Sequence, residues 1–138
     1  MPNETRILIL DDEIDLLDTL VSYLREDCRY RVYPAARAED AIAYLRRGTV
    51  DLALLDVGAH GLRVAREAMS DGIPTILMSG SPVILESGPV GEVMRKPFSL
   101  AALRMNIERA IGGHQIGGTV TAERAIGLRA SGRLPSTA

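Results

Sequence analysis

The chain has little cysteine, few aromatic residues and no long apolar run. Its 138 residues include one cysteine, Cys28, and five aromatic side chains. A single thiol excludes an internal disulfide and a metal cage built from cysteines. Apolar runs are short, such as the four residues at 7–10, whereas a membrane-spanning helix needs about 20. The amino terminus lacks an apolar signal-peptide core, so we expect a cytoplasmic protein with no membrane partner.

The charge balance is nearly neutral. Sixteen basic residues against 18 acidic ones give a net charge of −2, which does not favour nucleic acid as a partner. Five aromatic residues are also too few for a platform that stacks bases. The basic residues are 15 arginines and one lysine, Lys96. Because an ammonium and a guanidinium are not interchangeable at a tight site, Lys96 is a candidate functional residue.

Apolar periodicity predicts strands that alternate with helices. Short, mostly apolar segments predict strands at 6–10, 29–33, 50–55, 73–78 and 90–95. Helical spacing predicts helices at about 14–26, 38–47, 60–70 and 99–111, with caps at Gly48 and Ser99 and a turn at 71–72. Alternation of this kind implies parallel strands covered on both faces. We therefore predict an α/β fold, a doubly wound five-stranded parallel sheet over residues 4–112, followed by a flexible C-terminal tail at 113–138.

Polar side chains lie at the ends of four predicted strands, where the functional crevice of an open α/β sheet is found. They are Asp11, Asp12, Glu13, Asp56, Ser79 and Lys96. Each has an ordinary structural explanation: an aspartate can cap a helix, a serine can lie in a loop, and a lysine can be solvated. Their coincidence at four strand ends instead favours one pocket. Clustered carboxylates need a cation, for which Mg²⁺ is the natural choice, and a carboxylate can attack phosphorus to give an aspartyl phosphate.

Four segments, ILILDDE, LALLD, ILMSG and RKPF, resemble the receiver domain of two-component response regulators over about residues 5–111. The resemblance implies a flavodoxin-like receiver fold that binds Mg²⁺. It implies metal ligands from Asp11, Asp12, Asp56 and the backbone carbonyl of Gly58. Asp56 is then the phosphoacceptor, Ser79 the hydroxyl that turns toward the phosphoryl group, and Lys96 its cationic partner. A cis bond between Lys96 and Pro97 is also implied.

The chain departs from this family pattern in three places. The loop after Asp56 is short and lacks the usual proline, and we expect His60 there to be a loop residue rather than a ligand. Val93 stands where the family often has an aromatic switch residue. Only 16 residues, with two prolines at 82 and 89, separate Ser79 from Lys96. The family's fourth helix should therefore be short or missing, and we expect segment 80–91 to be a mobile loop that reports phosphorylation together with the last helix.

Two functions remain after this comparison. The first is a phosphoacceptor response regulator, which receives a phosphoryl group on Asp56 from a histidine kinase or phosphotransfer protein and signals by protein contact. Such a protein catalyses only its own phosphorylation and dephosphorylation, and the sequence leaves its output partner and its dimerisation open. The alternative is a degenerate receiver that acts as a phosphorylation-independent binding module. A phosphatase that forms an aspartyl phosphate is disfavoured. Such enzymes carry the nucleophile in a DxD motif after the first strand, whereas this chain has Asp-Asp-Glu there. A dinucleotide-binding fold is disfavoured because no glycine-rich turn follows that strand.

Overall fold

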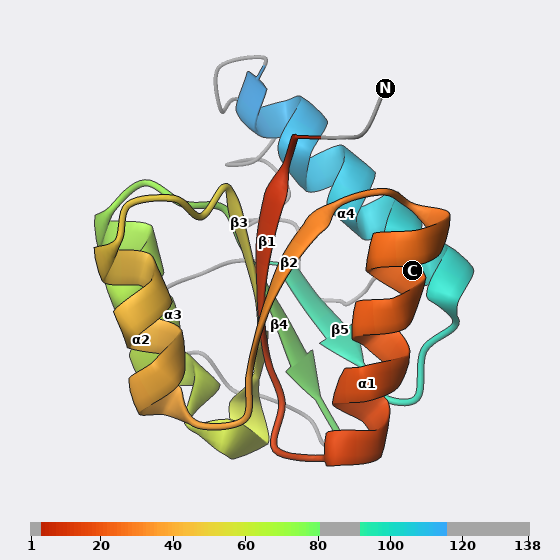
Figure 1. Ribbon diagram of the computed structural model, residues 1–138, viewed down its shortest axis with the longest axis horizontal. Helices are drawn as coiled ribbons and strands as arrows, with labels where there is room; N and C mark the ends of the chain where they lie inside the picture. Colours follow the sequence, from red (N-terminus) through yellow and green to blue (C-terminus); the bar gives the residue numbers. More distant parts are fainter. Residues whose placement is uncertain (1–3, 81–91, 116–138) are drawn as a thin grey trace.

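The computed structural model describes residues 4–80 and 92–115, which form one five-stranded sheet between helices (Figure 1). All strand pairs are parallel and the strand order is β2-β1-β3-β4-β5. The strands are β1 (Arg6–Leu10), β2 (Arg31–Ala35), β3 (Leu52–Asp56), β4 (Thr75–Ser79) and β5 (Glu92–Arg95). The predicted α/β fold class, a doubly wound five-stranded parallel sheet, is confirmed.

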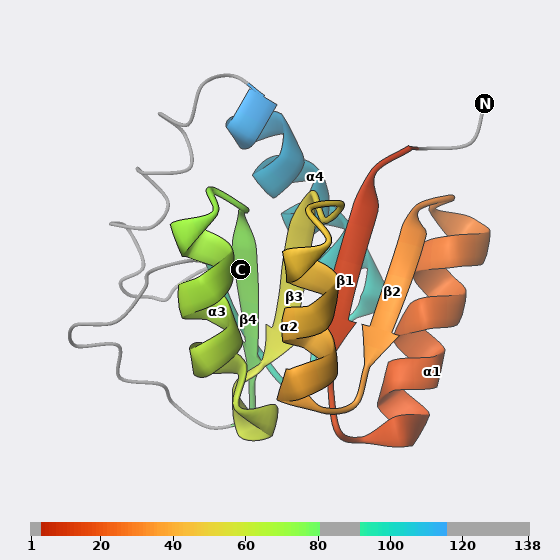
Figure 2. The ribbon, with the colours of Figure 1, turned by 60° about the vertical axis from the view of Figure 1, so that its left-hand side comes forward.

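Among the described residues, two helices cover each face of the sheet (Figures 1 and 2). One face carries α1 (Ile14–Ser22), which continues into a π-helical turn at Tyr23–Asp27, and α4 (Leu100–Gln115). The other face carries α2 (Ala38–Arg46) and α3 (Gly61–Ser70). In the part of the chain that the structure describes, no helix is long and apolar enough to cross a membrane.

The alternation of side chains along β1 explains why both faces need cover. Ile7 and Ile9 pack with the α1 and α4 side, whereas Leu8 and Leu10 pack with the α2 and α3 side, and all four are fully buried. Successive side chains of a strand point to opposite faces. A continuous apolar strand is therefore satisfied only between two helical layers, and this places β1 and β3 at the centre of the molecule.

The ladder register moves several strand bounds from their predicted places. The first pairs are Ile7 with Leu52 and Ala53 with Thr75, so β3 and β4 begin two residues after the predicted starts at 50 and 73. Strand β2 is found at Arg31–Ala35 instead of 29–33 and includes Pro34. A proline is tolerated there because β2 is an edge strand that pairs only with β1. Hydrogen-bond pairing, rather than apolarity alone, sets these bounds.

The predicted helix ends are confirmed in part. Gly48 and Gly72 adopt positive φ angles of 73° and 77° after α2 and α3, and the Ser99 hydroxyl accepts a hydrogen bond from the N–H of Ala102 at 3.0 Å. The first helix was expected to be α-helical to 26, but its last turn is a π-helix. Helix α4 continues to Gln115, beyond the predicted end at 111. The expected short helix and loop within 81–91 and the tail from 116 onward lie outside the described residues.

The connection from β3 to α3 passes so close to the end of β3 that only glycine fits at position 61. A Cβ atom on Gly61 would overlap the carbonyl oxygen of Asp56 and lie 2.7 Å from its carbonyl carbon. Both atoms belong to the backbone and cannot move independently of the strand. Gly61 therefore holds the chain after Asp56 in a tight turn.

We predict that Gly61→Ala lowers the free energy of unfolding by about 1–3 kcal/mol, the usual cost of overpacking. Urea unfolding measures this change. Gly112→Ala is the matched control, because a Cβ there meets nothing within 4 Å and a helical alanine is favoured over glycine by about 1 kcal/mol. Equal unfolding midpoints for the Gly61 variant and the wild type would contradict the close approach.

Candidate functional site

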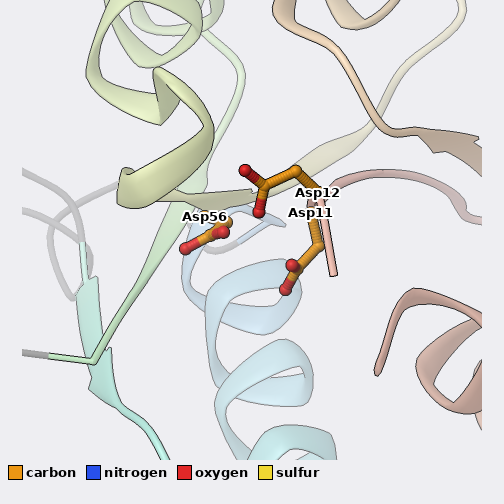
Figure 3. A group of neighbouring side chains, drawn as sticks. All are labelled: Asp11, Asp12 and Asp56. Atoms are coloured by element: carbon orange, nitrogen blue, oxygen red, sulfur yellow. The ribbon is translucent and has the colours of Figure 1, made fainter. Parts of the chain in front are cut away.

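Three aspartates meet at the carboxyl edge of the two central strands (Figure 3). Asp11 and Asp12 directly follow β1, and Asp56 is the last residue of β3. One carboxylate oxygen from each lies within 4.8 Å of the others. The predicted acidic cluster is therefore present, and the β1–β3 pairing is what brings its members together.

The three aspartates differ in exposure and in their local contacts. Asp11 is fully buried and Asp56 is 5% exposed, whereas Asp12 faces solvent. The N–H of Glu13 donates to Oδ1 of Asp11 at 2.9 Å, and the N–H of Gly58 donates to Oδ1 of Asp56 at 3.2 Å. These backbone donors fix the orientation of the two buried carboxylates.

Lys96 completes the cluster with a positive charge. Its Nζ atom lies 3.0 Å from Oδ2 of Asp11, 3.2 Å from Oε1 of Glu13 and 3.5 Å from Oδ1 of Asp56. The peptide bond between Lys96 and Pro97 is cis, as expected. The predicted convergence of Lys96 with the carboxylates on one pocket is therefore found, and its pairing with a phosphoryl oxygen stays a prediction.

The remaining predicted residues surround this cluster. Ser79 ends β4 and is 3% exposed, and its carbonyl oxygen accepts the N–H of Lys96 at 2.7 Å. Gly58 lies in a 3₁₀ turn, Val57–Ala59, directly after Asp56. His60 follows in a left-handed conformation with an exposed side chain. Val93 on β5 packs against the core on the α2 and α3 side.

Two contributions were missed by sequence reasoning. The sequence shows Glu13 only as part of an acidic run, yet its side chain hydrogen-bonds to Lys96. Its position directly after the two aspartates was the available signal. Gly61 was not singled out, and nothing in the sequence distinguishes a glycine required by close backbone approach from any other loop glycine.

The surroundings of Asp56 disfavour the ionised form of its carboxyl group. Burial raises the pKa of Asp56, and the negative charge of Asp11 raises it further, against smaller opposing effects of Lys96 and Gly58. Burial lowers the pKa of Lys96, but its contacts with Asp11, Asp56 and Glu13 more than compensate, so its pKa is raised. The site therefore favours the charged form of Lys96 and disfavours the ionised form of Asp56.

The donor set fits a hard divalent cation. Carboxylate and carbonyl oxygens are the ligands that Mg²⁺ takes in proteins, usually with several waters. Asp11, Asp12 and Asp56 supply three such carboxylates within reach of one ion, and the exposure of Asp12 leaves room for water. A bound cation would also offset the repulsion that raises the pKa of Asp56.

We predict that Asp56→Asn stabilises the metal-free protein at neutral pH. A carboxyl group whose pKa is raised by folding makes the folded state less stable when it is ionised, and this cost is lost as pH falls through that pKa. The variant removes the charge, so the melting temperature should rise by about 4 °C, the shift that ~1 kcal/mol produces in a domain of this size. Asp18→Asn, on the exposed side of α1, is the control and should not change it. A lower melting temperature for Asp56→Asn would contradict the repulsion.

Comparison with known proteins identifies the fold. No family model matches the chain. The regulatory protein VanR of Enterococcus faecium is 30% identical over 79 residues, which cover 54% of this chain and 34% of VanR, so the match spans about a third of that relative. A CheY-like response regulator receiver domain protein from Methanospirillum hungatei superimposes with a TM-score of 0.74 at 25% identity, over 84% of this chain and all of that one. The chemotaxis response regulator CheY4 of Vibrio cholerae gives 0.67 at 20% identity, over 78% and 99% of the two chains. With the acidic cluster and Lys96 at the strand ends, these matches show that the chain has the fold of a CheY-like response regulator receiver domain.

Proposed function

We propose that this receiver domain is a phosphoacceptor. Asp56 takes a phosphoryl group from a phosphohistidine of a kinase or phosphotransfer protein, and the phosphorylated domain signals by contact with another protein. The observation that supports this best is the placement of Asp56. Its carboxylate is nearly buried at the carboxyl edge of β3, close to two further aspartates and 3.5 Å from the ammonium of Lys96.

The contacts of Asp56 suggest which oxygen reacts. Oδ1 accepts the N–H of Gly58 and faces Lys96, so we assign the attack on phosphorus to Oδ2. The new Oδ2–P bond forms as the bond from phosphorus to the donor's imidazole nitrogen breaks, and that nitrogen keeps the electron pair. Lys96 then offsets charge on a phosphoryl oxygen, and the Ser79 hydroxyl at the adjacent strand end donates a hydrogen bond to another. Hydrolysis of the acyl phosphate returns the domain to its starting state.

Mg²⁺ belongs to the same proposal. Asp11, Asp12, Asp56 and the backbone carbonyl of Gly58 are the residues that would hold it. When bound, the ion supplies positive charge against the carboxylates and the phosphoryl oxygens. The protein's own contribution is to orient Asp56 through Gly58 and to keep Lys96 charged beside it.

We predict that millimolar Mg²⁺ raises the melting temperature, because an ion that binds only the folded state stabilises it, by about 2.7 kcal/mol at a hundredfold excess over Kd. Asp12→Ala should abolish most of this shift. Asp18→Ala removes an exposed aspartate on α1, the helix that follows Asp12, and this variant should keep the full Mg²⁺ shift. A full Mg²⁺ shift in the Asp12 variant, measured by thermal unfolding, would rule out this metal site.

We predict that Asp56 is the only phosphorylated residue. Incubation with Mg²⁺ and phosphoramidate should add one phosphoryl group by intact mass to the wild type and none to Asp56→Asn. Asp51→Asn is the control and should react normally, because Asp51 lies at the opposite edge of the sheet, where its Oδ2 accepts the N–H of Arg6 at 2.8 Å. If the wild type gains no phosphate under these conditions, the degenerate binding module becomes the better description.

A further inference from the structure

Among the described residues, Glu13 is the solvent-exposed partner of Lys96. We propose that Glu13 is a positioning residue that holds Lys96 in the unphosphorylated site and must release it when a phosphoryl group arrives. The inference rests on the proposed function, since it concerns how Lys96 becomes available to the phosphoryl oxygens. It assigns to this glutamate an inhibitory contact within the phosphorylation site.

Three carboxylate oxygens lie close to the ammonium group of Lys96. An ammonium group carries three N–H donors and no acceptor. Nζ donates hydrogen bonds to Oδ2 of Asp11 at 3.0 Å and to Oε1 of Glu13 at 3.2 Å, and it lies 3.5 Å from Oδ1 of Asp56 in an ion pair. The Lys96 side chain is only 16% exposed, which leaves little room for a fourth partner. A phosphoryl oxygen that pairs with Lys96 therefore competes with these three oxygens for the ammonium group.

Burial decides which partner is displaced. The Asp11 side chain is completely buried, so water cannot take the place of the lysine at its Oδ2 atom, and loss of a buried acceptor's hydrogen-bond partner is costly. Asp56 is the residue that carries the phosphoryl group and stays beside Lys96. The Glu13 side chain is 66% exposed, and water can replace the lysine as its partner. Glu13 is therefore the partner that is released.

Release of this contact shifts the balance between two states of the site. The Glu13–Lys96 pair exists in the unphosphorylated state and is lost in the phosphorylated one, so it stabilises the former relative to the latter. A ligand can shift such an equilibrium only by its difference in affinity for the two states. Removal of the Glu13–Lys96 pair should consequently make the site bind a phosphoryl group or its mimic more tightly.

We predict that Glu13→Gln binds beryllofluoride, a phosphoryl mimic, more tightly at saturating Mg²⁺. The gain in affinity should be about two- to fivefold, the range that an exposed ion pair allows. Glu39→Gln is the matched control, because Glu39 is 62% exposed and pairs with Arg37 at 3.6 Å on α2. Unchanged affinity in the Glu13 variant would overturn the proposal.

Two further variants distinguish a direct Glu13–Lys96 contact from a long-range effect of the Glu13 charge. Glu13→Asp keeps the charge but shortens the side chain, so it should behave like Glu13→Gln if the contact matters. Wild-type affinity in the aspartate variant would overturn the proposal in favour of a longer-range charge effect. In a Lys96→Met background, Glu13→Gln should have no effect, because a double-mutant cycle removes the coupling with the partner. A full effect without the lysine would also overturn it.

The single lysine gives a direct readout that needs no phosphorylation. Because Lys96 is the only lysine of the chain, protein labelled with ¹³C-lysine shows one set of side-chain NMR signals. The Lys96 Cε signal of the unphosphorylated protein should move in Glu13→Gln and stay in place in Glu39→Gln. A signal that does not move refutes the Glu13–Lys96 contact. If the signal moves but the wild type fails to bind beryllofluoride, the contact is real and the proposed function, with the release step that depends on it, is wrong.

Discussion

The ammonium of Lys96 against the carboxylates of Asp11 and Asp56 is the interaction on which the site depends. Both aspartates are nearly or fully buried, and carboxylates in such positions are costly unless they are paired. Lys96 supplies that pairing from a position 85 residues along the chain from Asp11. The contact therefore joins the first strand to the segment after the last strand and gives the carboxyl edge of the sheet a defined charge arrangement.

The strand order makes this arrangement possible. Strands β1 and β3 are neighbours at the centre of the sheet, so their carboxyl ends place Asp11 and Asp56 side by side. The burial that raises the pKa of Asp56 comes from the same central position. The two helical layers that bury the apolar strands thus also keep water away from this edge of the sheet. A carboxylate placed there has a pKa that differs from that of a solvated one.

The site combines rigid and replaceable contacts. Backbone N–H groups of Glu13 and Gly58 orient the two buried aspartates, and Gly61 allows the chain after Asp56 to turn back against the strand end. The side chain of Glu13, by contrast, reaches Lys96 from solvent. This combination of a fixed acidic frame with a solvent-exposed partner is the arrangement that the proposed release of Lys96 from Glu13 requires.

The sequence by itself determined the α/β class, the alternation of strands and helices, and the residues at the strand ends. Apolar runs that end abruptly in Asp11, Asp56 and Ser79 are local signals, and parallel strands bring such ends to one edge. Only the tertiary structure decided the strand bounds, because the ladder register with a neighbour selects which residues pair, as Pro34 in the edge strand β2 illustrates. It also decided the roles of Glu13 and Gly61. A contact between a glutamate and a lysine 83 residues apart, and the close approach of a glycine to a carbonyl, depend on distances in space that no local pattern encodes.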